Sequence, residues 1–206
     1  MKPSIWDRLS RKYDTLWVQK HSLSPTRKKI TEILGKLVTQ PDFKMLDIGC
    51  GTGQLIEDLS AQYPLAFFTG IDKSERMVAL AQEKNPSHRF LTVAAEKLAF
   101  DEACFDFITC CHSFPYYQDK EAVVDRIKKI LKPNGYAIFV QASVNNRYDH
   151  FVMWIVEKTA ETAEYLSRRE VRRFFTDGFT VVQEFIIKEK WYMPSICGFV
   201  LRGRKC

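Results

Sequence analysis

Three glycines at alternate positions directly follow a short apolar run that contains an acid. The run 45–48 carries Asp47, and Gly49, Gly51 and Gly53 come next, before a segment that begins like a helix. A glycine turn between a strand and a helix lets the main chain lie close to a bulky ligand, because no Cβ intervenes. The stretch therefore predicts a ligand cradle in an α/β protein.

The register of these glycines tests which ligand they hold. A dinucleotide fingerprint, G-x-G-x-x-G, requires a glycine at position 54 when it starts at Gly49, and at position 56 when it starts at Gly51. The chain has Gln54 and Ile56 there, so the pattern fails in both registers. Asp47 also disfavours an anionic pyrophosphate, and instead favours a cationic or hydrogen-bond-donating ligand.

The bulk properties of the chain indicate one globular unit. It has 206 residues, 46% of them hydrophobic and 27% charged, so we treat residues 1–206 as a single domain. No apolar run reaches the ~18 residues of a membrane helix, and the first residues hold no apolar core, so we expect no membrane partner and no secretory signal. Six cysteines without CxxC or disulfide-like spacing favour free thiols and a cytoplasmic location.

The net charge of +6 hints weakly at an anionic partner. Much of it gathers near the ends of the chain, in residues 8–29 and 168–173. We interpret these clusters as solvated helix faces rather than as a nucleic-acid surface.

Hydrophobic periodicity and turn residues predict strands that alternate with helices. Such alternation is typical of right-handed βαβ units and a mostly parallel sheet. The expected helices are 4–20, a second one capped by Ser24-Pro25, 54–62, 74–84, 119–131 and one from Ser167 to about Phe175. The expected strands are 43–48, 65–71, 89–93, 105–111, 136–141, 179–188 and 195–202, with a turn at 132–135 and an antiparallel pair at the end.

Two further segments are expected to shape the site. Residues 1–40 form a helical N-terminal cap, with Tyr13 and Trp17 as candidate lid residues. Residues 143–166 interrupt the alternation and contain the apolar run 151–156. We interpret that run as a buried helix segment, and a lid over the ligand or a dimer contact remains an alternative.

Five ordered blocks carry a family resemblance. They are Leu46-Asp47-Ile48-Gly49-Cys50-Gly51-Thr52-Gly53, Gly70-Ile71-Asp72-Lys73-Ser74 with Met77, Ala95-Glu96-Lys97-Leu98-Ala99-Phe100, Phe105-Asp106-Phe107-Ile108, and Leu131-Lys132-Pro133-Asn134-Gly135-Tyr136. In this order the chain resembles the class I S-adenosylmethionine-dependent methyltransferases over roughly residues 40–142. The resemblance implies a Rossmann-like, seven-stranded, mostly parallel sheet with an antiparallel last strand and helices on both faces.

The resemblance also implies roles for the amino-acid and ribose ends of the cofactor. Asp47 and the turn Gly49–Gly53, Cys50 included, would hold the amino-acid end. The carbonyl of Cys110 would face its ammonium group. Asp72 would accept hydrogen bonds from both ribose hydroxyls, which suits a charged bidentate acceptor.

The remaining implied contacts concern the adenine and the closing helix. Lys73 and Met77 would lie along the adenine, although Met77 is also a plausible core residue. Ala95 and Glu96 would meet its edge. Many relatives carry an acid where this chain has Ala94, so Glu96 is expected to substitute for it. In relatives with a similar Tyr-Asp pair, here Tyr13-Asp14, the first helix closes over the cofactor.

The segment after the fourth predicted strand, 111–117, is the candidate acceptor side. His112 could act as a base at neutral pH, or be a hydrogen-bonded loop histidine. Phe114-Pro115-Tyr116 is similar to the (Asn/Asp)-Pro-Pro-Tyr signature of amino-directed nucleic-acid methyltransferases. Ser113 and Phe114 depart from that signature, so we set it aside. Tyr116 and Tyr117 either line an aromatic pocket or roof the sheet.

A thiol cluster is the other chemistry that the predicted topology allows. Neighbouring strands would bring Cys50 near Cys110 and Cys111, beside His112. Their spacing matches no standard zinc site, and we predict no metal.

The prediction from sequence is methyl transfer from S-adenosylmethionine to O, N or S of a small molecule, leaving S-adenosylhomocysteine. A general base is needed only when the accepting atom arrives protonated. An RNA or protein methyltransferase, and a non-catalytic cofactor-binding module, are the alternatives. We expect no nucleic-acid partner, and a monomer or homodimer.

Overall fold

A computed structural model describes residues 5–159, 163–190 and 192–204. The helices are α1 (Ile5–Leu9), α2 (Ser24–Leu37), α3 (Gln54–Ser60), α4 (Glu75–Lys84), α5 (Lys120–Ile130), α6 (Arg147–Thr159) and α7 (Arg168–Arg173). The strands are β1 (Lys44–Ile48), β2 (Phe67–Asp72), β3 (Arg89–Thr92), β4 (Phe105–Cys111), β5 (Leu131–Ala142), β6 (Phe179–Ile187) and β7 (Ile196–Gly203). Shorter helical turns are η1 (Ser10–Thr15), η2 (Gln19–Leu23), η3 (Ala95–Lys97) and η4 (Phe114–Tyr116).

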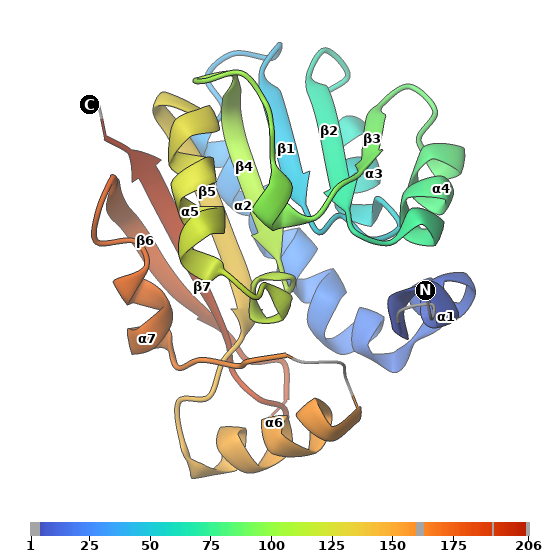
Figure 1. Ribbon diagram of the computed structural model, residues 1–206, viewed down its shortest axis with the longest axis vertical. Coiled ribbons are helices and arrows are strands. Elements are labelled where there is room, and N and C mark those ends of the chain that lie inside the picture. The colour runs from blue at the N-terminus through green and yellow to red at the C-terminus, as the bar shows by residue number, and fades with distance from the viewer. Residues whose placement is uncertain (1–4, 160–162, 191, 205–206) are drawn as a thin grey trace.

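The strands form one seven-stranded sheet in the order β3-β2-β1-β4-β5-β7-β6. β1 to β5 run parallel, while β7 pairs antiparallel with both β5 and β6. The predicted fold class and the antiparallel last strand are confirmed. The arrowheads of β1, β2 and β4 all point toward the side where α1 and α6 lie (Figure 1). That carboxyl edge of the sheet is where ligands bind in open α/β proteins.

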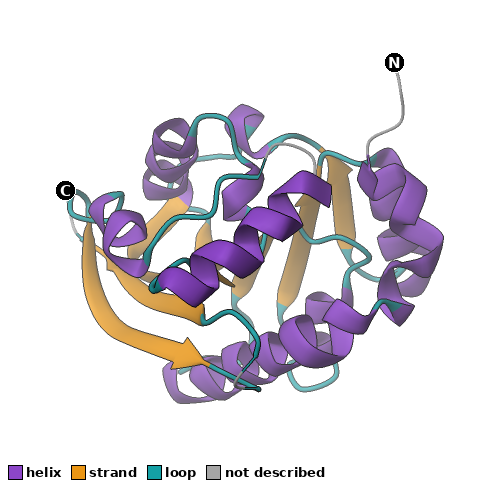
Figure 2. Ribbon diagram, turned by 90° about the horizontal axis from the view of Figure 1, so that it is seen from below, coloured by secondary structure: helices purple, strands orange, loops and turns teal. Residues whose placement is uncertain are grey.

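Each face of the sheet carries its own core, as expected for a sheet with helices on both sides (Figure 2). One core contains α5 and α7, with Val123, Ile127 and Val171 fully buried. The other contains α2 and α3, with residues such as Ile30 and Ile56. The same strands supply both cores, because successive side chains of a strand point to opposite faces. This double packing fixes the strand ends that build the site.

The predicted single helix 4–20 is wrong, because the segment is broken. α1 ends at Leu9, a 3₁₀ turn follows, and Leu16 is extended, with φ −63° and ψ 145°. A π turn, Gln19–Leu23, then runs directly into α2. The predicted start of the second helix at Ser24-Pro25 is confirmed, with Pro25 in its first turn, but the capping role of Ser24 is wrong. The residue before α2, Leu23, is itself helical and makes no side-chain capping hydrogen bond.

The predicted turn at 132–135, before the fifth strand, is wrong. The predicted turn 132–135 lies inside β5, which begins at Leu131. Phe105 pairs with Leu131 and Phe107 with Tyr136, so the intervening residues form a bulge, and Asn134 takes a positive φ of 66°. Unlike a turn, a bulge does not reverse the direction of the chain. It leaves the extra residues unpaired while the strand continues.

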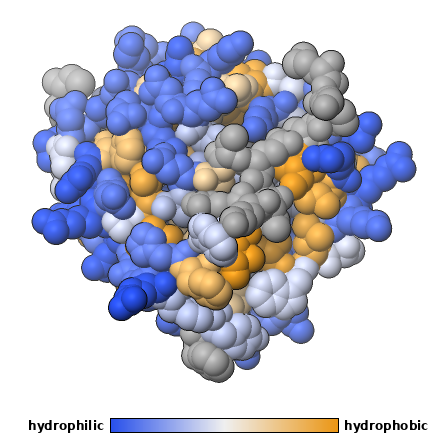
Figure 3. Space-filling model, turned by 60° about the horizontal axis from the view of Figure 1, so that its bottom comes forward, coloured by the Kyte–Doolittle hydropathy of each residue, from blue (hydrophilic) through white to orange (hydrophobic). Residues whose placement is uncertain are grey.

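The interpretation of 151–156 as a buried helix segment is wrong. These residues lie in α6, where Phe151 is 60% exposed, Trp154 52% and Ile155 46%. Met153 alone in this run is fully buried. α6 lies below the carboxyl edge of the sheet, and apolar side chains gather on that face of the molecule (Figure 3). A helix that packs on an open site instead of on the sheet buries only one of its sides.

The C-terminal elements follow the prediction closely. Ser167 caps α7 in a capping box with Glu170, and Gly178, with a positive φ of 81°, follows the helix. Within the described ranges, no helix has the length and apolar character needed to cross a membrane.

Candidate functional site

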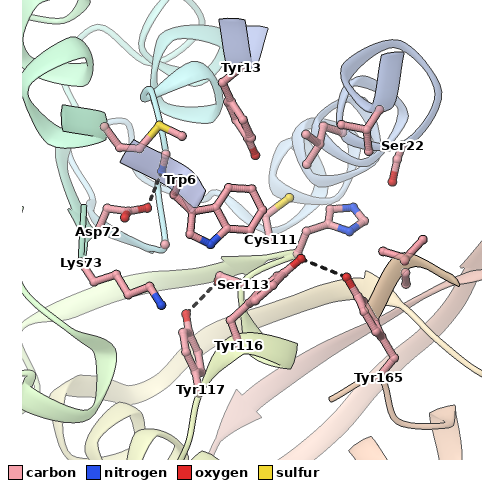
Figure 4. Close-up of a pocket in the computed structure, with 18 of the residues that line it drawn as sticks. Trp6, Tyr13, Ser22, Asp72, Lys73, Cys111, Ser113, Tyr116, Tyr117 and Tyr165 are labelled. Carbon is pink, nitrogen blue, oxygen red and sulfur yellow. Dashed lines mark hydrogen bonds between the residues drawn. The ribbon is translucent and has the colours of Figure 1, made fainter. Parts of the chain in front are cut away.

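A cavity of about 600 Å³ opens at the carboxyl edge of the sheet. Its walls come from the glycine turn, the ends of β2 to β5, the N-terminal segment, α6 and residues 192–194. The volume lies within the range of small-molecule sites in proteins. Figure 4 shows the aromatic and polar side chains that converge on it.

The glycine turn has the backbone that the sequence predicted. Gly49, Gly51 and Gly53 all have positive φ, at 75°, 54° and 79°. A Cβ on Gly49 would lie 2.3 Å from the Cβ of Ser113, whereas one on Gly51 would enter the space in front of Tyr13, 3.5 Å from its ring. Gly49 is therefore required by packing, and Gly51 by the open space that a ligand would fill.

Asp72 ends β2 and faces the glycine turn. Its Oδ2 accepts the Gly51 N–H at 3.0 Å, and its Oδ1 accepts the Ser74 N–H at 2.9 Å. Burial raises the pKa of the carboxyl, while these two hydrogen bonds work in the opposite direction. A carboxylate has about four acceptor sites, so each oxygen keeps one for a further donor. Two neighbouring hydroxyl groups match that arrangement.

Asp47 is buried one strand away, with 2% of its surface exposed. Thr109, its register partner on β4, donates a hydrogen bond to Oδ1 at 2.7 Å. Burial, with a smaller contribution from the charge of Asp72, raises the pKa of Asp47 to about 7. The side chain lies behind the glycine turn and is absent from the cavity wall.

The N-terminal segment is attached to this end of the cavity by two carboxylates. Asp14 accepts a hydrogen bond from Thr52 in the glycine turn at 2.6 Å and pairs with Lys84 on α4. Asp7 accepts one from Ser74, the N-cap of α4. These contacts hold the segment against the turn and bring aromatic side chains over the site.

His112 follows β4 with a left-handed backbone, φ 58°. Its N–H donates to the carbonyl of Val140 at 2.7 Å, and its Nε2 lies 2.9 Å from Oγ1 of Thr26 on α2. Burial lowers the pKa of His112 to about 4. The imidazole lines the cavity and is neutral at physiological pH.

Aromatic rings and hydroxyls form the rest of the cavity. Trp6 packs edge-on against Tyr116, with ring centroids 5.1 Å apart, and also against Tyr13. The hydroxyls of Tyr116 and Tyr165 lie 3.0 Å apart (Figure 4). Burial raises the pKa of Tyr116, so its phenol stays protonated.

Charge divides the cavity into two parts. Its charged lining residues are Asp72, Lys73, Glu96 and Lys97, all from the end of β2 or the segment after β3. The described residues that line the cavity from 16–23, α6 and 192–194 are all uncharged. One part is thus suited to a polar ligand and the other to an uncharged, apolar one.

Comparison with known proteins finds a matching domain and several similar enzymes. A family model described as a methyltransferase domain matches residues 46–139. The demethylmenaquinone methyltransferase of Thermotoga maritima is 28% identical over 66% of this chain, which spans 59% of that enzyme. The ubiquinone biosynthesis O-methyltransferase of Idiomarina loihiensis is 27% identical over 88% of this chain and 77% of its own length.

A solved structure shares the fold. Magnesium protoporphyrin IX methyltransferase from Synechocystis, with bound SAH, superposes with a TM-score of 0.74 at 19% identity, over 92% of this chain and 88% of that one. The chain belongs to the class I S-adenosylmethionine-dependent methyltransferases. The cofactor of this class is S-adenosylmethionine.

Most of the residues predicted to hold the cofactor lie around one end of the cavity. The lining includes Tyr13, Gly49, Gly51, Asp72, Lys73, Met77, Ala95 and Glu96, and the candidate base His112. Met77 is also fully buried, so it serves the core as well. Glu96 accepts the N–H of Gln118 at 3.0 Å, which ties the segment after β3 to the loop before α5.

Four predicted residues do not line the cavity. They are Asp47, Cys50, Gly53 and Cys110. Cys110 shares hydrogen bonds with Ser113 and Tyr117, and burial raises the pKa of its thiol to about 11. Among the described residues, no group of three or more His, Cys, Asp or Glu side chains is placed to hold a metal ion.

Sequence reasoning missed several residues of the methyltransferase site. Trp6 and Tyr165 line the cavity. Arg27 lies outside the cavity wall and connects α2 to α3 through hydrogen bonds to Gln54 at 2.7 Å and Asp58 at 2.8 Å. No local pattern marks Trp6 or Tyr165, because their roles depend on where the broken N-terminal segment and the segment after α6 fold back. Arg27 was visible only as part of a basic run.

Proposed function

We propose that the chain transfers a methyl group from S-adenosylmethionine to an uncharged, largely apolar small molecule. The division of the cavity carries this proposal. The charged part, with the glycine turn and Asp72, suits the cofactor, and the uncharged aromatic part suits the acceptor. The names of the relatives refer to demethylmenaquinone and to ubiquinone biosynthesis, and acceptors of that apolar class suit the uncharged part.

The residues present fit the cofactor. Asp72 keeps two acceptor sites for the ribose hydroxyls, and the space in front of Gly51 would be filled by a side chain larger than hydrogen. Met77, Ala95 and Glu96 line the part of the cavity next to Asp72 and are proposed to hold the adenine. Asp47, behind the turn, is proposed to favour the ammonium group electrostatically or through water.

When bound, the cofactor supplies a sulfonium whose methyl group is already activated for in-line attack. The protein then has to orient the acceptor, exclude water and take up a proton where one is released. Tyr116, Tyr165 and α6 enclose the acceptor part, and His112 is proposed as the group that accepts a proton. The N-terminal segment, held by Asp14, contributes Tyr13 and residues 16–18 to the cavity wall.

Cofactor binding is the first test. Isothermal titration should show binding of S-adenosylmethionine and S-adenosylhomocysteine to the wild-type chain. Asp72→Ala should weaken it roughly 5- to 150-fold, the equivalent of the ~1–3 kcal/mol lost when polar groups are left unpaired. Asp42→Ala, which removes an exposed acid outside the cavity, is the matched control. No binding by the wild type would overturn the proposal, and unchanged affinity in Asp72→Ala would remove that residue from the site.

The second test identifies the type of acceptor. The chain is incubated with methyl-labelled cofactor and a cell extract, and the label is followed through solvent extraction and size fractionation. We expect it in small molecules that partition into an organic solvent. Label in RNA or protein would support the macromolecular alternative, and cofactor binding without any transfer would support the binding module.

A further inference from the structure

A threonine outside the cavity contacts the candidate base. Thr26 lies in the first turn of α2, fully buried, and its Oγ1 is 2.9 Å from Nε2 of His112, 86 residues away. His112 lines the cavity, whereas Thr26 does not. Thr26 therefore acts on the site only through the imidazole.

The hydrogen bonds of Thr26 determine which atom donates and which accepts in its contact with His112. A threonine hydroxyl has one proton to donate. Thr26 donates it to the carbonyl of Ser22 at 2.8 Å, a contact that stays within the helix. Toward His112, Oγ1 is then left as an acceptor, so Nε2 must carry the proton of the neutral ring. The other ring nitrogen, Nδ1, keeps its lone pair.

We propose that Thr26 is a positioning residue that holds His112 in the Nε2–H tautomer, so that Nδ1 receives the proton of an acceptor hydroxyl during methyl transfer. The inference rests on the proposed function and names its acceptor as a hydroxyl compound. With Nε2 occupied by Thr26, Nδ1 is the only ring nitrogen left to meet a ligand in the cavity.

The backbone of His112 is also held in place. A non-glycine residue in the left-handed region is uncommon and persists where its surroundings hold it. Here the N–H of His112 donates to Val140 at 2.7 Å, on the neighbouring strand β5. The contact with β5 fixes the main chain at His112, and the contact with Thr26 on α2 orients the ring and selects its tautomer.

The proton transfer balances with the chemistry of the proposed reaction. The acceptor oxygen forms a bond to the methyl carbon, the carbon–sulfur bond breaks, and its electron pair stays on sulfur. The hydroxyl proton moves to Nδ1 and later leaves to solvent. Burial keeps the pKa of His112 near 4, so the lone pair is available at neutral pH. The hydroxyl becomes acidic enough for so weak a base only as the oxygen–carbon bond forms.

The tautomer is measured directly by long-range ¹H–¹⁵N NMR of the chain labelled at its four histidines. His112→Gln assigns the resonances. At pH 7 we expect His112 to have a protonated Nε2 and an unprotonated Nδ1. Thr26→Val removes the hydroxyl at nearly constant volume and should give a mixed or inverted tautomer. Thr26→Ser keeps the hydroxyl and should restore the wild-type spectrum.

Two results would overturn the proposal: a wild-type ring that is protonated at Nδ1, or a Thr26→Val variant that keeps the wild-type tautomer. With a hydroxyl acceptor in hand, Thr26→Val should lower kcat about 10- to 100-fold with little change in KM, and Thr26→Ser should recover most of it. The NMR result requires neither cofactor nor acceptor. If methyl transfer fails, the tautomer result still stands. If the tautomer is not the expected one, the test of methyl transfer is unaffected.

Discussion

Asp47 is expected to lower the stability of the fold while it favours cofactor binding, and both effects can be measured. Its carboxyl is 2% exposed, and its pKa rises from 3.8 to about 7 in the folded chain. Because the folded-state pKa lies above the unfolded one, ionised Asp47 destabilises the fold. The cost is complete above pH 7, shrinks as the pH falls and vanishes below pH 3.8. At about 1.4 kcal/mol per pKa unit, it amounts to about 4 kcal/mol at pH 8 and about 2 kcal/mol at pH 5.

Asp47→Asn removes the charge and retains an oxygen for the hydrogen bond from Thr109. Its amide N–H₂ group adds a cost of about 1–2 kcal/mol that does not depend on pH, as expected for a buried donor without a partner. The variant should therefore gain about 2 kcal/mol more over the wild type at pH 8 than at pH 5. Urea denaturation followed by tryptophan fluorescence at both pH values measures this difference.

The matched control is Asp42→Asn, whose side chain is exposed and which should show no such pH dependence. An Asp47→Asn stability difference that is equal at pH 5 and pH 8 would refute the reasoning. Isothermal titration on the same variant measures the other half of the trade-off. If Asp47 favours the ammonium group as proposed, the more stable variant should bind S-adenosylmethionine more weakly.

Two further substitutions separate packing from binding. Gly49→Ala places a Cβ 2.3 Å from Ser113 at a positive φ, so thermal unfolding should show a loss of about 2 kcal/mol or more. Gly51→Ala is also strained by its positive φ and should cost about 1 kcal/mol, but its Cβ meets no atom closer than the Tyr13 ring at 3.5 Å, so its larger effect should be on cofactor affinity. Equal losses of stability in both would contradict this distinction. Ser167→Ala removes the capping box of α7 and should cost about 1 kcal/mol, or about 2–4 °C in Tm, whereas an unchanged Tm would show that the cap contributes nothing.

The parts of the site that the sequence predicted are those that local geometry determines. The register at Gln54 and Ile56 excluded a dinucleotide, and the class of cofactor, with the role of Asp72, came from the resemblance carried by the five ordered blocks. The alternation of strands and helices placed these residues at one edge of a sheet. Positive φ at Gly49, Gly51 and Gly53 follows from the same short motif.

The acceptor part of the cavity could not be predicted from the sequence, because it is assembled from segments without local patterns. The apolar run in α6 has the composition of a buried helix, yet Phe151 and Trp154 are exposed, since the helix packs on a cavity instead of on the sheet. The N-terminal segment carries an apolar spacing typical of one helix. Contacts of Asp7 and Asp14 with residues far along the chain hold it in a broken form instead.

By itself, then, the sequence determined the fold class and the glycine turn, because strand periodicity and glycine backbone geometry act over a few residues. The cofactor's end of the site was predicted from the family resemblance. Only the tertiary structure decided how that turn is completed into a site. It placed Thr26 against His112 across 86 positions and brought Trp6 and Tyr165 to one wall. Such contacts depend on the packing of α2 and α6 at the carboxyl edge of the sheet, a long-range outcome that no short stretch encodes.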